Sequence, residues 1–233
     1  MAERELLQER SAILTNGSDR GSARNGGPLS EILNMIMDFF LKIREVGVHM
    51  KGFIRSDRLF SLCGLNCGLC TMRLGGCCPG CGGGEGNQGC AIARCSLEHG
   101  GVAYCFQCGE YPCARCQEAE HDSFITYQNR LRDLEKARRT GMDAYWAEQR
   151  ERSGILQLLL ERYNDGRKKT LFALAANLLE LEDLREILER LSEETAQLPL
   201  RERAVRAAVL CRDAAALRGI DLRLRKPPGK SGK

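Results

Sequence analysis

The sequence predicts a mainly α-helical protein, in which a small, irregular, zinc-ribbon-like metal module rich in cysteine precedes an all-α helical bundle. Two observations lead to this fold class. Twelve of the 13 cysteines lie between Cys63 and Cys116, and apolar residues recur at helical spacing through most of the chain that follows. That second half has no alternation of strand and helix patterns of the kind that builds a parallel sheet.

Four segments of different composition divide the 233 residues. Residues 1–54 are expected to form an N-terminal extension, with a flexible linker rich in Gly, Ser and Asn and one amphipathic helix at about 30–46. The cysteine-rich module follows, then the helical domain, and the chain ends in a basic flexible tail. These three segments span residues 55–121, 122–217 and 218–233.

The helical domain is expected to contain five helices separated by short polar or proline-containing breaks. One of them carries a clear apolar stripe from Leu181 to Leu191, with Glu and Arg on the opposite face. Such stripes indicate the core of a helix bundle, and Cys211 is expected to be a small buried hydrophobe within it. This half of the sequence carries no recognisable catalytic motif. The expected helices span about 123–139, 142–163, 167–178, 181–194 and 200–217.

The module has too few apolar side chains to fold by burial alone. Between Cys63 and Cys116 the chain has 13 glycines but only ten residues of Ile, Leu, Val, Met, Phe, Tyr and Trp together. So few apolar side chains do not offset the conformational entropy lost when such a segment is ordered. Structural zinc contributes roughly 10–16 kcal/mol of apparent binding free energy per site in small peptides. The composition therefore predicts a module held together by metal.

Four cysteine pairs in the module have the spacing C-x-x-C, which lets two thiolates reach one ion from a single tight turn. Two of the pairs are followed directly by Gly82 and Gly109. We expect these glycines to adopt positive φ, as in the turns of zinc knuckles. The pairs are Cys67/Cys70, Cys78/Cys81, Cys105/Cys108 and Cys113/Cys116.

Two metals stay open at this point, because thiolates suit both tetrahedral zinc and iron–sulfur clusters. The knuckle form of the turns favours zinc, at two or more sites. The C-x3-C-x2-C run of Cys63, Cys67 and Cys70 keeps an iron–sulfur cluster as the alternative, with a role in electron transfer or redox chemistry. Redox catalysis by a thiol pair is disfavoured, because four such pairs crowd together in a glycine-rich sequence.

The charge of the module argues against nucleic acid as a partner. Residues 55–121 carry five arginines against six acids, and every zinc held by four thiolates adds a further charge of about −2. Binding to nucleic acid depends on a basic surface that neutralises phosphates. The formal excess of +4 in the whole chain comes from residues 218–233, which have a net charge of +5.

The first residues lack the basic and then apolar order of an export signal, and no apolar run is long enough to span a membrane. These features predict a cytoplasmic protein without a membrane-spanning segment. Disulfides are disfavoured in that compartment, which again favours metal as the reason for the cysteines.

The cysteine run resembles one known family. Cys63-Gly-Leu-Asn-Cys67-Gly-Leu-Cys70 and the segments 78–81, 90–95 and 105–113 agree in order, spacing and flanking Gly or Pro with the bacterial and archaeal family called domain of unknown function 3795. The resemblance covers about residues 60–115 and implies an intracellular zinc-binding protein, without an assigned activity. It implies ten metal ligands by position: Cys63, Cys67, Cys70, Cys78, Cys81, Cys90, Cys95, Cys105, Cys108 and Cys113.

Three further residues are weaker candidates for ligands. Cys77 and Cys116 lie outside the family motif, and His99 lies between Cys95 and Cys105, where it would replace a thiolate. The sequence therefore favours a non-catalytic zinc-binding protein of unknown cellular role that docks a protein partner. An iron–sulfur protein with a redox role is the alternative, and no catalytic residue is expected.

Overall fold

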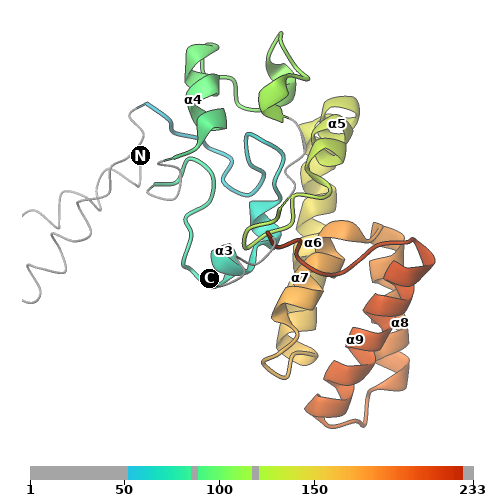
Figure 1. Ribbon diagram of the computed structural model, residues 1–233. Coiled ribbons are helices and arrows are strands. Elements are labelled where there is room, and N and C mark those ends of the chain that lie inside the picture. Colours follow the sequence, from blue (N-terminus) through green and yellow to red (C-terminus); the bar gives the residue numbers. More distant parts are fainter. Residues whose placement is uncertain (1–51, 85–88, 117–120, 228–233) are drawn as a thin grey trace, which may run out of the picture. The chain divides into compact units, whose positions relative to one another are not determined.

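The computed structural model describes residues 52–84, 89–116 and 121–227. Within these ranges the chain forms seven α-helices, joined by turns and short 3-10 helices, and no strand (Figure 1). The prediction of a mainly helical protein is confirmed. The zinc-ribbon-like form expected of the cysteine-rich module is not confirmed, because its described residues contain no strands. The expected linker and the expected helix at about 30–46 lie outside the described residues.

All five helices expected in the C-terminal half are present. The first begins at Arg130 rather than near residue 123, because side chains hold the preceding residues in turns. Asp122 Oδ1 accepts the backbone N–H of Tyr127 at 2.8 Å, and Thr126 Oγ1 accepts that of Gln128 at 3.2 Å. The five helices are α5 (Arg130–Thr140), α6 (Met142–Arg162), α7 (Lys169–Leu178), α8 (Leu181–Glu194) and α9 (Leu200–Leu217).

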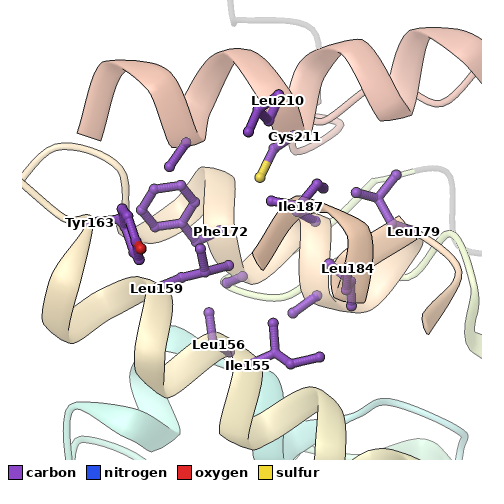
Figure 2. Close-up of a cluster of buried hydrophobic side chains, with 14 of the residues drawn as sticks. Ile155, Leu156, Leu159, Tyr163, Phe172, Leu179, Leu184, Ile187, Leu210 and Cys211 are labelled. Carbon is purple, nitrogen blue, oxygen red and sulfur yellow. The ribbon is translucent and has the colours of Figure 1, made fainter. Parts of the chain in front are cut away.

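Helices α6 to α9 share one apolar core (Figure 2). The predicted stripe of α8 is confirmed, since Leu184 and Leu191 are fully buried. Figure 2 shows the sulfur of Cys211 pointing into the cluster beside Ile187. Burial raises the pKa of the Cys211 thiol to about 12. Cys211 is thus a neutral small hydrophobe in the core, as predicted.

The cysteine-rich module consists of turns and short helices. They are η1 (Cys67–Leu69), α3 (Thr71–Leu74), α4 (Ala91–Glu98), η3 (Cys105–Gln107) and η4 (Ala114–Cys116). The longest, α4, begins after Cys90, whose sulfur accepts the backbone N–H of Ala93 at 3.4 Å as an N-cap. Cysteines therefore stand at the ends of several of these elements, and Cys90 also caps a backbone group.

The module buries its apolar side chains against α5 and α6. Phe60, Leu62 and Tyr104 share a second core cluster with Leu134 and Tyr145. Gly64 lets the two parts approach closely, because a Cβ at this position would lie only 2.6 Å from Leu134 Cγ. The module and the helices belong to one compact unit, Gly47–Lys233. Side chains from both sides of the expected boundary at residues 121 and 122 therefore belong to this core cluster.

A buried polar network also joins the module to the helices. Asp133 Oδ2 accepts hydrogen bonds of 2.6 Å from Asn66 Nδ2 and from Asn129 Nδ2. The Tyr145 hydroxyl donates to Asn66 Oδ1 at 2.8 Å. Asp133 is only 5% exposed, and its burial raises the pKa of the carboxyl group from 3.8 to about 6. Asn66, next to Cys67, is held in place by this network.

The raised pKa of Asp133 predicts a pH dependence of stability that Asp133→Asn should remove. The unfolded chain releases this proton near pH 3.8 and the folded chain near pH 6, so stability is lost as pH rises through that window. The loss amounts to about 3 kcal/mol in the free energy of unfolding. We expect urea unfolding at pH 4.5 and 7 to show the variant gaining on the wild type by about 2 kcal/mol, the part of the loss that falls between these two pH values. A constant difference between the two proteins would contradict the assignment.

The first part of the expected flexible tail packs against the helices. Ile220 and Leu222 contact the apolar core. The backbone N–H and the guanidinium group of Arg225 each donate to the Asp122 carboxylate at 2.9 Å. Arg218 pairs with Asp183 in the same way. Arg223 pairs with Asp221. Three arginines of this segment thus each pair with an aspartate.

No helix in the described parts of the chain is long and apolar enough to cross a bilayer.

Candidate metal centre

All 13 cysteines are free thiols, and most of those in the module are partly shielded from solvent. Cys77 is exposed, and its thiol lies 3.6 Å from the carbonyl oxygen of Gly75. Three expected or candidate ligands are buried, and apart from Cys77 the others are half-buried. The buried ones are Cys70, Cys105 and Cys116.

One group of thiols, which we call the first thiol cluster, consists of Cys63, Cys67, Cys70 and Cys81. Burial, together with the charges of the other three thiols, raises the pKa of Cys67 to about 12. Cys67 begins η1 and Cys70 follows its last residue. The four cysteines come from two segments of the sequence motif, and the charges of the other three act on Cys67.

Arg55 lies beside the first thiol cluster, and the sequence did not single it out. Its guanidinium group donates to the carbonyl oxygens of Phe60 at 3.0 Å and of Ala103 at 2.7 Å. Burial raises the pKa of the Cys81 thiol, and the neighbouring Arg55 opposes that rise. Arg55 Nε is buried and has no hydrogen-bond partner among the described residues. A cation with a spare donor at this place suits a negatively charged sulfur.

The turn of Cys78 and Cys81 has the geometry expected of a knuckle. The backbone N–H of Gly80 donates to Cys78 Sγ at 3.4 Å, and Gly82 has a φ of 77°. The second expected knuckle differs, because Gly109 does not adopt positive φ. There, Cys105 begins the 3-10 helix η3, and the Cys108 backbone N–H bonds to the Cys105 carbonyl oxygen at 3.1 Å. A helical turn thus replaces the left-handed residue.

The second thiol cluster consists of five cysteines around one small cavity. Burial raises the pKa of Cys105, and the charges of Cys116 and Cys113 add to the rise. The Sγ atoms of Cys113 and Cys116 are 3.9 Å apart, close to the edge of about 3.8 Å in a tetrahedral zinc site with Zn–S bonds of about 2.3 Å. The cavity measures about 20 Å³, and the cysteines that line it are Cys95, Cys105, Cys108, Cys113 and Cys116.

His99 also lines this cavity, but both of its ring nitrogens are engaged. Nδ1 lies 2.8 Å from the carbonyl oxygen of Cys95, and Nε2 lies 3.3 Å from a carboxylate oxygen of Glu110. The hydrogen bond to Cys95 and the one to Glu110 both raise the pKa of His99. A carbonyl oxygen only accepts, so Nδ1 carries a proton and is no base for the Cys95 thiol, which is 3.6 Å away. This arrangement counts against His99 as a metal ligand and as a catalytic base.

The thiols fit a metal by their chemistry and in one pair by distance, but not as a complete preassembled set. In the described ranges, no three His, Cys, Asp or Glu side chains lie close enough together to hold one ion. Cys78 and Cys90 lie outside both thiol clusters, each with its sulfur bonded to a backbone N–H. The structure thus gathers eight of the ten expected ligands, together with Cys116, into two groups.

Comparison of the chain with protein-family models, with curated proteins and with solved structures finds no match. The resemblance noted above rests on the spacing of the cysteines.

Proposed function

We propose that this protein is a non-catalytic zinc-binding protein whose metal-held module, packed on the helices, serves to dock a protein partner. The first thiol cluster carries the proposal. Its four thiols lie close enough for their charges to interact, and they are shielded from water. Such thiols resist ionisation on their own, whereas a zinc ion at their centre stabilises the thiolate forms.

Two sets of four cysteines would hold the metal. The first thiol cluster supplies Cys63, Cys67, Cys70 and Cys81. In the second, the pairs Cys105/Cys108 and Cys113/Cys116 border the same cavity and offer two C-x-x-C turns. Zinc supplies cross-links between turns that have few apolar contacts of their own. Arg55 would offset part of the negative charge of the first site. A cytoplasmic location belongs to the same proposal, since a reducing compartment keeps the thiols free.

An iron–sulfur protein with an electron-transfer role is the second candidate. It is favoured by one observation, that the C-x3-C-x2-C run of Cys63, Cys67 and Cys70 lies within a single cluster. Cys63 also influences the pKa of Cys105, so it lies within electrostatic range of both clusters. Cysteine thiolates hold such clusters as readily as zinc.

Purification without oxygen, followed by measurement of zinc, iron and sulfide, separates these candidates. We expect a colourless protein with about two zinc ions per chain. A brown protein with iron and matching sulfide would replace the proposal by the second candidate. A chain that holds neither metal, even after anaerobic incubation with zinc, would refute both.

A further inference from the structure

A groove of about 940 Å³ lies between α6 and the chain around α3. One wall is a continuous stripe of α6, formed by residues three or four positions apart: Trp146, Gln149, Arg150, Ser153, Gly154 and Gln157. Ser56–Phe60 and Gly68–Leu74 contribute the facing residues. No cysteine is among the described residues that line the groove, although Gly68 and Leu69 stand between Cys67 and Cys70 of the first thiol cluster.

Part of the groove is apolar and still exposed. Leu59 is 53% exposed and Leu74 is 42% exposed. Trp146, the single tryptophan of the chain, donates its Nε1–H to Asp57 Oδ2 at 3.1 Å, which fixes the indole ring. Fixed tryptophans beside exposed leucines are typical of the anchor points of protein interfaces.

The charge of the groove selects an acidic occupant. Arg73 and Arg150 line it, and neither forms an ion pair within the described part of the chain. Asp57 is the single acidic lining residue, and its carboxylate is already satisfied by the backbone of Leu59 and Phe60, the Tyr104 hydroxyl and the indole. Arg73 Nη1 donates to the Cys78 carbonyl oxygen at 3.5 Å, and the remaining guanidinium N–H groups of the two arginines are available for carboxylates of a partner.

Two further features of α6 are unexplained by the chain itself. Gly154 stands inside a 21-residue helix, where alanine is more favourable, and a Cβ there would meet no atom within 4 Å. Gln149 Oε1 is buried and has no hydrogen-bond partner among the described residues. A partner that packs closely over Gly154 accounts for the glycine.

We propose that this groove binds an acidic amphipathic helix of a protein partner. Its apolar side chains would lie against Leu59, Leu74 and Trp146, and its carboxylates against Arg73 and Arg150. The stripe from Trp146 to Gln157 is about 17 Å long, which matches about three helical turns. This inference rests on the proposed docking role.

Fluorescence of Trp146 provides the test, because the only tryptophan of the full-length chain lies in the groove. Two synthetic tryptophan-free helical peptides of equal length serve as probes, one with Leu and Glu and one with Leu and Lys. We expect the emission of Trp146 to change and then to saturate as the acidic peptide is added. Arg73→Glu combined with Arg150→Glu should weaken its binding at least tenfold and favour the Lys peptide. Arg212→Glu, on the exposed surface of α9, is the matched control and should change nothing.

A second variant tests the close approach. Gly154→Ala should raise the thermal stability of the protein and yet weaken binding of the acidic peptide, because the added methyl group occupies the contact. Three results would overturn the inference. The first is no emission change up to about 1 mM peptide, and the second is equal binding of both peptides. The third is that the protein forms dimers that Arg150→Glu dissociates, which would mean that a second copy of the chain occupies the groove. Zinc content measured on the same samples keeps this test distinct, since a zinc-loaded protein that fails to bind refutes the groove alone.

Discussion

Cys67→Ser is expected to remove about one zinc ion per chain and to lower the unfolding temperature by about 10 °C or more. Cys67 lies at the centre of the first thiol cluster, since the pKa of its thiol responds to Cys63, Cys70 and Cys81 together. Serine is nearly the same size but is a poor zinc ligand, so the variant loses the metal rather than the packing. Without the cross-link, the turns between Cys63 and Cys81 have few apolar contacts to hold them.

Cys77→Ser is the matched control, because Cys77 lies in the same segment but is exposed and outside both thiol clusters. It should keep the zinc content and the unfolding temperature of the wild type. Zinc per chain and thermal unfolding, measured on proteins purified side by side without oxygen, give the comparison. If both variants kept equal zinc and melted together, the first cluster would not be a metal site.

The helices of the C-terminal half were predictable because their apolar stripes repeat at helical spacing over ten or more residues. The start of α5 was not, since it depends on hydrogen bonds from Asp122 and Thr126 to nearby backbone N–H groups. The packing of the module was also missed. Its own apolar residues are few, but Leu134 and Tyr145, far along the chain, complete its core. Counting residues within the module alone therefore overstated how much metal is needed to fold it.

Spacing identified which cysteines are candidates, but it did not predict how they group. The C-x-x-C pattern suggests that Cys78 and Cys81 act together, whereas the electrostatic neighbours of Cys81 include Cys63. The Cys78 sulfur bonds instead to the backbone of its own turn. Arg55 carried no signal in the sequence, because its approach to Cys81 depends on tertiary contacts with Phe60 and Ala103. Local pattern therefore predicts the ligand types, and the tertiary fold decides the sets.

Arg152→Met is expected to lower the free energy of unfolding by about 3–5 kcal/mol. Arg152 is 4% exposed, and its Nη1 donates to the carbonyl oxygens of Ala176 at 2.9 Å and Leu179 at 2.7 Å. These carbonyls end α7, where no further backbone N–H reaches them. Nε bonds to Glu148 at 2.9 Å. The variant would leave two buried carbonyls and part of a carboxylate without their donor.

Denaturant unfolding of three variants separates this role from the general effect of losing a charge. Arg162→Met removes an exposed arginine from the end of the same helix and should cost less than about 1 kcal/mol. Arg152→Lys keeps the charge but lacks the second nitrogen that bonds Glu148 while Nη1 bonds the two carbonyls, so it should fall between the two. Equal stabilities of the Arg152→Met and Arg162→Met proteins would show that the end of α7 does not depend on this guanidinium group. If the Arg152→Met protein is the least stable, the Arg152→Lys protein intermediate and the Arg162→Met protein the most stable, the Arg152 guanidinium group links α6 to the end of α7.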